Sequence, residues 1–196
     1  MGEGAVFDAE QRMVPADPGR YRELVAGLDR EVAEARKAGT VTVGLLRRAG
    51  VGHLVLRELA EAEELLTEAL RLCEGEDAPR RQVAVLINLG DAHRYGGDLA
   101  AAWPCYRRAL WLARERCPEV TDFALQHMGK HRTDAGDFAA AERLLTEALW
   151  LRREKEDPEL LASTEQALAY CRRRAREAGA ADAGAVREGG EGVRRG

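Results

Sequence analysis

Apolar residues recur every three or four positions through much of the chain, which is the period of an α-helix that buries one face. In one stretch this spacing places Leu99, Ala102, Tyr106, Ala109 and Leu110 on a single helical face. Gly and Asp punctuate these stretches and predict turns between paired helices. Because neither helix of a pair can bury its apolar stripe alone, the pattern predicts stacked pairs.

The turns carry a recurring helix-start signal. Asp98 and Asp137 follow Gly97 and Gly136 and precede the second helix of their pairs. A carboxylate at this position accepts hydrogen bonds from free backbone N–H groups, so both Asp residues are predicted to be helix N-caps.

The chain also matches itself at an offset of about 40 residues, which indicates internal repeats. Gly97 to Ala102 aligns with Gly136 to Ala141, and Ala109 to Leu112 aligns with Ala148 to Leu151. An earlier, weaker copy shares the same register. The small residues Gly50, Gly90 and Gly129 are separated by about the same offset of 40 residues.

These residues resemble the tetratricopeptide repeat (TPR) family in a long-period form. The middle copy supplies the family pattern with Leu89-Gly90, Gly97-Asp98, Ala102, Tyr106 and Ala109-Leu110, and the next copy supplies Met128-Gly129, Gly136-Asp137, Ala141, Leu145 and Ala148-Leu149. The first-helix aromatic positions of the family are instead held by Leu, His or Arg. The resemblance implies an all-α, right-handed α-solenoid of stacked helix–turn–helix repeats with N- and C-terminal capping helices.

The domain organisation follows from the repeat register. A disordered N-terminus is predicted for residues 1–17, and a disordered, Gly-rich and charged tail is predicted for residues 179–196. The predicted ordered segments are a capping helix or degenerate repeat at 18–39, repeats at about 43–76, 83–116 and 122–155, and a capping helix at 158–178.

Charge and cysteine content narrow the function classes. The chain has 34 acidic and 30 basic residues and a formal charge of −4, so it lacks the basic excess typical of nucleic-acid binders. No apolar run is long enough to span a bilayer, and no signal peptide is recognised at the start. Four widely spaced cysteines are expected to be reduced core residues, which favours a cytoplasmic protein; they are Cys73, Cys105, Cys117 and Cys171.

Candidate catalytic or metal chemistry is sparse. His127 and His131 lie four residues apart, but the segment lacks the Glu that follows the first His in hydrolytic zinc sites. No Gly-rich phosphate loop or nucleophile motif is present. We therefore expect no enzyme activity, no metal and no cofactor.

The first helices of a TPR stack line a concave groove, which is the main candidate site. Its cationic, amide and aromatic side chains favour a protein or peptide partner with an acidic segment. We expect these side chains at the surface. The predicted groove residues are Arg47, Arg48, Asn88, Asp91, Arg94, Tyr95, Phe123, Gln126, His127, Lys130, Tyr170 and Arg173.

A second candidate surface lies on the opposite side of the second helices. Trp111 and Trp150 occupy equivalent positions in consecutive repeats and point away from the predicted core. Pro104 interrupts the second helix of the middle repeat, and a kink there is expected to turn Trp103 toward solvent. The leading hypothesis is thus an interaction adaptor, and the alternative is a subunit that forms a homodimer through Trp111 and Trp150.

Overall fold

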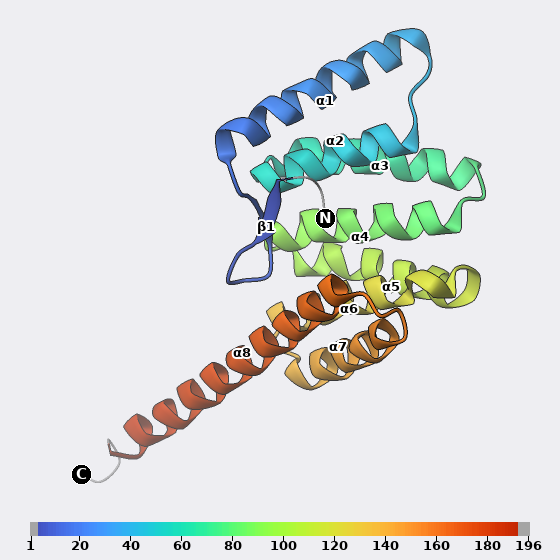
Figure 1. The fold of residues 1–196 in the computed structure, drawn as a ribbon. Helices are drawn as coiled ribbons and strands as arrows, with labels where there is room; N and C mark the ends of the chain where they lie inside the picture. The colour runs from blue at the N-terminus through green and yellow to red at the C-terminus, as the bar shows by residue number, and fades with distance from the viewer. Residues whose placement is uncertain (1–3, 192–196) are drawn as a thin grey trace.

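The computed structural model describes residues 4–191 of the chain, with side chains described as far as residue 181. Eight α-helices, two short strands and one 3₁₀ turn are found in that part (Figure 1). The elements are β1 (Ala5–Phe7), β2 (Met13–Pro15), α1 (Pro18–Ala38), α2 (Val43–Leu56), α3 (Leu59–Gly75), α4 (Pro79–Tyr95), α5 (Leu99–Arg116), η1 (Pro118–Val120), α6 (Thr121–Asp134), α7 (Phe138–Arg153) and α8 (Pro158–Glu191).

Consecutive helices pack as antiparallel pairs, which are α2 with α3, α4 with α5 and α6 with α7. The pairs stack in chain order, with α1 at one end and α8 at the other (Figure 1). The first helices α2, α4, α6 and α8 also contact one another directly, so they form one face of the stack. The predicted all-α solenoid is therefore confirmed.

The second helices α5 and α7 begin at the Asp caps that the sequence predicted. The Asp98 carboxylate accepts a hydrogen bond from the Ala101 N–H at 2.8 Å, and the Asp137 carboxylate accepts one from the Ala140 N–H at 3.2 Å. These bonds satisfy backbone donors that have no partner within the helix.

The two helices of a pair approach most closely at a glycine of the first helix. A Cβ atom built on Gly90 would lie 2.7 Å from Cε1 of Tyr106, and one built on Gly129 would lie 2.6 Å from Cγ of Leu145. Gly50 meets Leu66 of its own pair in the same way. A side chain larger than hydrogen at these positions would force the helices apart.

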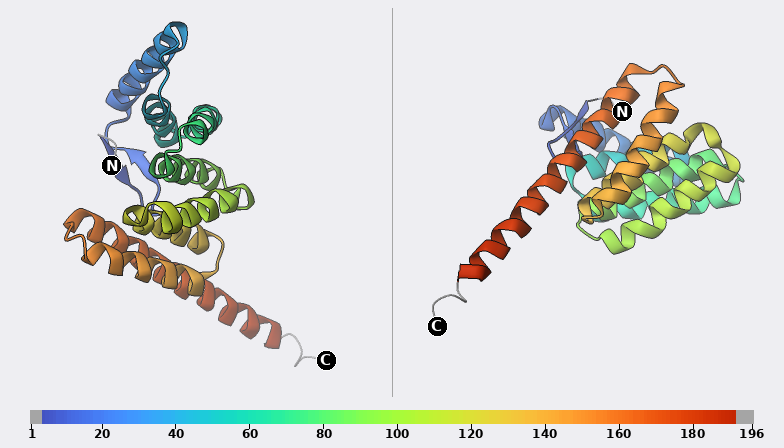
Figure 2. Two further views of the ribbon diagram at one scale, coloured as in Figure 1. Left: turned by 90° about the vertical axis from the view of Figure 1, so that its right-hand side faces the viewer. Right: turned by 90° about the horizontal axis from the view of Figure 1, so that it is seen from below.

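Residues 4–17 are ordered, contrary to the prediction of a disordered N-terminus at 1–17, of which residues 1–3 lie outside the described residues. Strands β1 and β2 pair antiparallel, with Ala5 opposite Pro15 and Phe7 opposite Met13. This N-terminal hairpin (residues 4–16) lies against the first-helix side of the stack, as the left view of Figure 2 shows. The prediction failed because the order comes from contacts with distant helices, which the local composition does not reveal.

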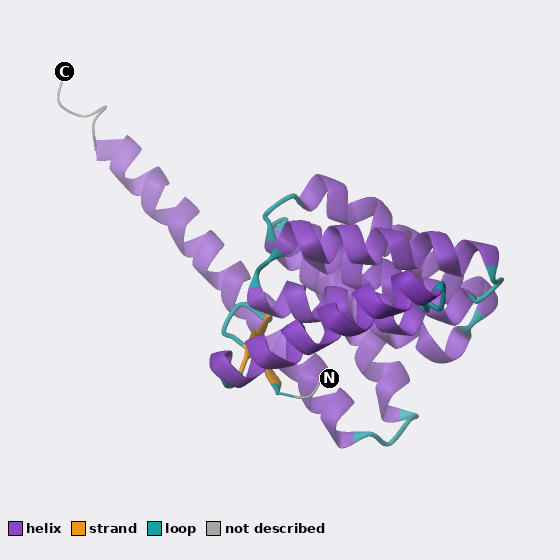
Figure 3. Cartoon of the chain, turned by 90° about the horizontal axis from the view of Figure 1, so that it is seen from above, coloured by secondary structure: helices purple, strands orange, loops and turns teal. Residues whose placement is uncertain are grey.

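The C-terminal boundary is also different from the prediction. Helix α8 continues to Glu191 instead of ending near residue 178, and its second half projects from the stack (Figure 3). Ala, Arg and Glu are strong helix formers, and in this segment they outweigh the Gly residues that suggested disorder. Residues 192–196 of the predicted tail lie outside the described residues.

Candidate functional site

The candidate site lies on the first-helix face, where α4 and α6 present polar side chains toward the N-terminal hairpin. Asp91, Arg94 and Tyr95 belong to the last turns of α4, and His127 and Lys130 belong to the middle of α6. Spacings of three or four residues bring these groups to one side of their helices.

A buried carboxylate forms the centre of this group. The Tyr106 hydroxyl donates a 2.6 Å hydrogen bond to Oδ1 of Asp91, and Nδ1 of His127 lies 2.9 Å from Oδ2. Burial alone would raise the pKa of the Asp91 carboxyl, but His127, Arg94 and Tyr106 lower that pKa to about 2. Asp91 is therefore ionised at neutral pH. Burial lowers the pKa of His127 below its ordinary value in spite of Asp91.

Arg94 connects this carboxylate to a second one on α6. Its Nη1 donates to Oδ2 of Asp134 at 2.9 Å, and its Nε lies 3.6 Å from Oδ1 of Asp91. The Tyr170 hydroxyl of α8 donates to the other Asp134 oxygen at 3.4 Å. Helices α4, α6 and α8 are thus joined through one buried polar network.

Lys130 is almost fully covered, at 1% relative exposure. Its Nζ lies 4.2 Å from the centre of the Phe7 ring of the hairpin, within range of a cation–π interaction. Burial, together with the charge of Arg94, lowers the pKa of Lys130 to about 7. Near neutral pH the Lys130 side chain is therefore close to the midpoint between its ammonium and amine forms.

The hairpin covers the polar side chains of this face. The Met13 N–H donates to the Tyr95 hydroxyl at 2.8 Å, and Arg94 Nη2 donates to the Gln11 carbonyl at 3.4 Å. Burial raises the pKa of Tyr95 to about 12, so this hydroxyl stays neutral. We refer to Asp91, Arg94, Tyr95, His127, Lys130 and Asp134 as the groove cluster.

Comparison with known proteins identifies two repeats of this architecture and a structure with a similar fold. Residues 85–116 and 124–159 match the sequence model of the tetratricopeptide repeat. These two segments are therefore identified as tetratricopeptide repeats. Its fold is similar to that of a kinesin light chain candidate from Podosopora anserina with nearly identical TPR-like repeats, at a TM-score of 0.61 and 16% identity over 91% of this chain and 90% of that chain. No curated protein sequence matches the chain. The TPR repeats support a role as a scaffold for protein–protein interaction.

The TPR groove differs from the open, charged surface that the sequence predicted. Asp91, Arg94, Tyr95, Gln126, Lys130 and Tyr170 are buried, Arg47, Asn88, Phe123 and His127 are partly buried, and Arg48 and Arg173 are exposed. The expectation that Arg94 and Lys130 lie at the surface is therefore wrong. Both side chains are buried because the hairpin and the neighbouring helices cover them.

The remaining predicted residues are divided between the two ends of the face. Near α2, Arg47 donates to Asn88 Oδ1 at 3.3 Å, and Arg48 pairs with Glu31 of α1 at 2.9 Å. At the opposite end, Gln126 donates to the Ser163 hydroxyl at 2.9 Å. Phe123 does not join the groove cluster, because its ring lies beneath the cationic ends of Arg152 and Lys155.

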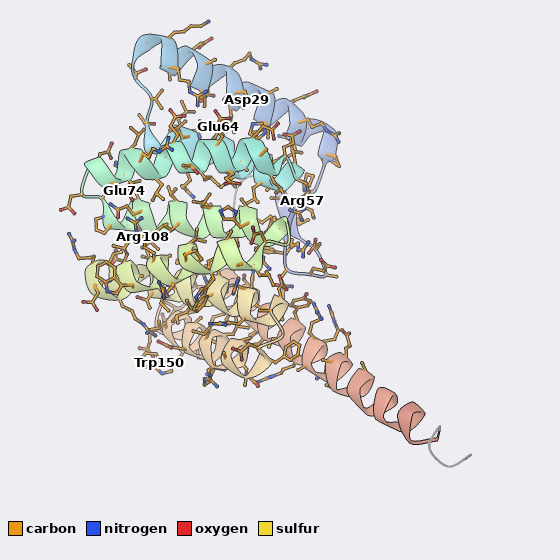
Figure 4. The ribbon with its side chains drawn as sticks, turned by 180° about the vertical axis from the view of Figure 1, so that it is seen from behind. Asp29, Arg57, Glu64, Glu74, Arg108 and Trp150 are labelled. Carbon is orange, nitrogen blue, oxygen red and sulfur yellow. The ribbon has the colours of Figure 1, made fainter. Side chains whose placement is uncertain are left out.

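The outer face carries the two tryptophans predicted there. Trp111 and Trp150 are 59% and 60% exposed. Figure 4 shows Trp150 on the outer side of α7, and it also shows Arg108 of α5 beside Glu74 of α3, a pair separated by 2.7 Å. Salt bridges of this kind link neighbouring second helices around the exposed rings.

Trp103 does not turn to solvent as expected. Its ring stacks on that of His131 with centroids 5.7 Å apart, and the Arg132 guanidinium lies 3.8 Å from its centroid. Pro104 remains inside the continuous helix α5. The neighbouring helix α6 supplies enough contact to hold the indole in place.

No group of three or more potential metal ligands occurs among the described side chains. His127 faces Asp91, whereas Nε2 of His131 lies 2.9 Å from the Leu99 carbonyl oxygen. The two imidazoles are thus held by separate partners. In the same part of the chain, no helix is long and apolar enough to cross a membrane.

Several residues of the face were missed by sequence reasoning. Tyr106 was recognised only as a core residue, and Asp134 received no role. Arg57, which follows α2 and lies near Asp8 of the hairpin, was missed as well. The hairpin residues Phe7 and Met13 carried no local signal. Asp134 could have been found from its place one turn after Lys130 on α6, since a buried cation on a helix commonly has a carboxylate neighbour.

Proposed function

We propose that the chain is a non-enzymatic adaptor whose first-helix groove binds an acidic peptide segment of a partner protein. The observation that carries the proposal is the hairpin itself, because a polypeptide segment already lies on this face and contacts its cationic side chains. Asp8 of the hairpin lies 3.6 Å from Arg57, and Phe7 covers Lys130. The groove thus accommodates an aromatic residue followed by a carboxylate.

Local charge supports an acidic partner. The formal charge of the chain is −4, yet Arg47, Arg57 and Arg173 add cations to the first-helix face outside the groove cluster, in which Asp91 and Asp134 offset the charges of Arg94 and Lys130. Such a local excess attracts acidic segments, and the attraction weakens as salt screens it. Arg47 and Arg48 lie on α2 and make no contact with the hairpin among those described, so they are suited to test the electrostatic contribution. The four free cysteines favour a reducing, cytoplasmic setting for this function.

The test is a selection from a displayed library of random peptides on the purified wild-type protein. Enriched peptides should be rich in Asp and Glu, with an aromatic or aliphatic residue nearby. Their affinity should fall as salt rises and should drop about tenfold, or ~1.4 kcal/mol, in Arg47→Gln/Arg48→Gln. Absence of an acidic preference would contradict the proposal.

The matched control removes two charges from the second helices. Arg107 and Arg153 are exposed on α5 and α7. Arg107→Gln/Arg153→Gln therefore lowers the net charge equally without touching the groove. If both double variants lose the same affinity, the effect comes from overall charge and the groove is not the site.

The outer face favours a second candidate function, self-association. Trp111 and Trp150 are the largest exposed apolar side chains described in the structure. Exposed tryptophans are enriched at protein interfaces. A homodimer through this face is compatible with a free groove on the opposite side of each repeat.

A further inference from the structure

The N-terminal hairpin is too small to be stable by itself. Its two strands have three residues each and form three residue pairs, from Ala5–Pro15 to Phe7–Met13. Isolated two-stranded hairpins are at best marginally stable in water, and this one is shorter than most. Its order in the structure therefore depends on its contacts with the helices.

Those contacts come from four successive first helices. Arg57 follows α2 and pairs with Asp8, and the Arg57 guanidinium also lies 4.4 Å from the Tyr95 ring centre. Figure 4 shows Arg57 at the hairpin end of α2. From α4, Tyr95 accepts the bond from Met13, and from α8, Arg173 Nη2 donates to the Ala9 carbonyl at 3.1 Å. Lys130 of α6 completes the set through Phe7.

The hairpin therefore spans the face that the adaptor would use for a partner. It offers an aromatic ring, a carboxylate and backbone carbonyls, and the face offers cations and a tyrosine hydroxyl. These are the groups expected in an acidic peptide ligand and in its binding groove. We propose that the hairpin is an intramolecular competitor that occupies the groove until an acidic partner segment displaces it.

The fit of the hairpin is incomplete, which favours displacement. Among the described residues, Gln11 Oε1, Arg12 Nε and Arg94 Nε are buried without a hydrogen-bond partner in the protein. Gln11 also adopts a positive φ of 60°, an unfavourable backbone conformation for a residue with a side chain. Release of the hairpin lets water bond the Gln11 and Arg12 atoms, and a partner segment that reaches Arg94 Nε would satisfy the group that belongs to the groove.

The connection to the solenoid permits release. Only Ala16 and Asp17 join Pro15 of β2 to Pro18 of α1, and both are exposed. Asp17 caps α1 by accepting bonds from the Gly19 and Arg20 N–H groups. Asp17 lies outside the hairpin, so this cap can stay in place when the hairpin leaves, and release uncovers the apolar contact of Ala5 and Met13 with the core.

The experiment uses a fluorescein-labelled synthetic peptide with the sequence of residues 4–16 as the probe. In the wild-type chain the attached hairpin competes with the probe, so only a small fraction of molecules has a free groove and apparent binding is weak. Phe7→Ala/Asp8→Ala removes two anchors of the attached hairpin but leaves the groove unchanged. This variant should bind the probe at least tenfold more tightly than the wild type.

Val6→Thr is the matched control. Val6 is 47% exposed and keeps a β-branched side chain after the change, so affinity for the probe should equal that of the wild type. Equal probe affinity in the wild type and the Phe7/Asp8 variant would overturn the inference. Circular dichroism establishes that the variant is folded.

A second measurement follows the wild-type chain alone. Hydrogen exchange of the Met13 amide should accelerate when a selected acidic peptide saturates the groove, because its bond to Tyr95 is lost. An unchanged rate at saturation would also overturn the inference.

This inference rests on the proposed function, and the two can fail separately. If acidic peptides bind the wild type and the Phe7/Asp8 variant equally well, the adaptor function stands and the competitor role is refuted. If the 4–16 probe binds the variant but library peptides show no acidic preference, the hairpin site stands and the proposed partner chemistry is refuted.

Discussion

Gly90→Ala tests the contact on which the middle repeat is built. A Cβ at this position would lie 2.7 Å from Cε1 and 2.8 Å from Cζ of Tyr106, closer than carbon atoms normally approach. The ring cannot easily move away, because Tyr106 is fully buried and its hydroxyl is bonded to Asp91 at 2.6 Å. The added methyl group must therefore separate α4 from α5.

The magnitude follows from two opposing effects. Overpacking a rigid contact costs about 1–3 kcal/mol. Replacing Gly with Ala inside a helix returns about 0.5–1 kcal/mol through helix propensity. We expect a net loss of about 1–2 kcal/mol, which lowers the melting temperature by roughly 3–6 °C in a chain of this size.

Gly27→Ala in α1 provides the control. A Cβ there meets only Arg30 Nη2 at 3.9 Å, an ordinary contact. Propensity should then dominate, and stability should rise by about 0.5–1 kcal/mol. Thermal unfolding followed by circular dichroism measures both variants. If Gly90→Ala melts at or above the wild-type temperature, the close approach of α4 and α5 does not limit side-chain size and the packing argument is wrong.

Three further changes probe other parts of the molecule. Burial lowers the pKa of His53, but hydrogen bonds to Asp29 and Glu58 more than offset this and leave the pKa raised. The interaction of charged His53 with the two carboxylates contributes fully to the free energy of unfolding below the ordinary histidine pKa of about 6.5, and this contribution is lost as pH rises through the raised value. In urea unfolding, His53→Gln should therefore differ from the wild type more at pH 6 than at pH 8. Trp111→Ala/Trp150→Ala should keep its helicity and turn any dimer into a monomer by light scattering, whereas a monomeric wild type at high concentration excludes this interface. Lys130→Met should raise the free energy of unfolding by about 1–4 kcal/mol at pH 6, measured by urea unfolding, because it removes a buried charge. The gain should shrink toward pH 9, where Lys130 of the folded wild type is already neutral. Equal gains at both pH values would refute a pKa near 7 for Lys130.

The repeat core was predictable because its signals are local. Asp98 and Asp137 were recognised as caps from the Gly-Asp turn and the helix that follows each. Gly90 and Ala109 were recognised from the register of small residues between two apolar stripes, and the structure places both in buried positions. In each case a residue and its partners lie within one repeat, so the sequence period contains the information.

The groove could be predicted only in part, because its burial comes from distant contacts. The register correctly placed Arg94 and Lys130 on first helices α4 and α6. Their cover was missed, since the bonds from Met13 to Tyr95 and from Arg94 to Gln11 span 82 and 83 residues. Three-residue strands have no detectable period in a sequence, and an acidic segment before the first helix is typical of a disordered terminus.

The buried charges connect the hairpin to the chemistry of a partner. Arg94, Asp91 and Asp134 surround Lys130 from α4 and α6, and Phe7 of the hairpin covers its ammonium. Since burial lowers the pKa of Lys130 to about 7, the covered state favours a neutral amine. A group that binds the charged ammonium after the hairpin has left therefore shifts the equilibrium away from the state in which the hairpin covers Lys130. A carboxylate of an acidic segment is such a group, whereas the Phe7 ring offers only a weak cation–π contact. Under the proposed function, the residue that would favour an acidic segment would therefore also make the hairpin easier to displace when such a segment binds.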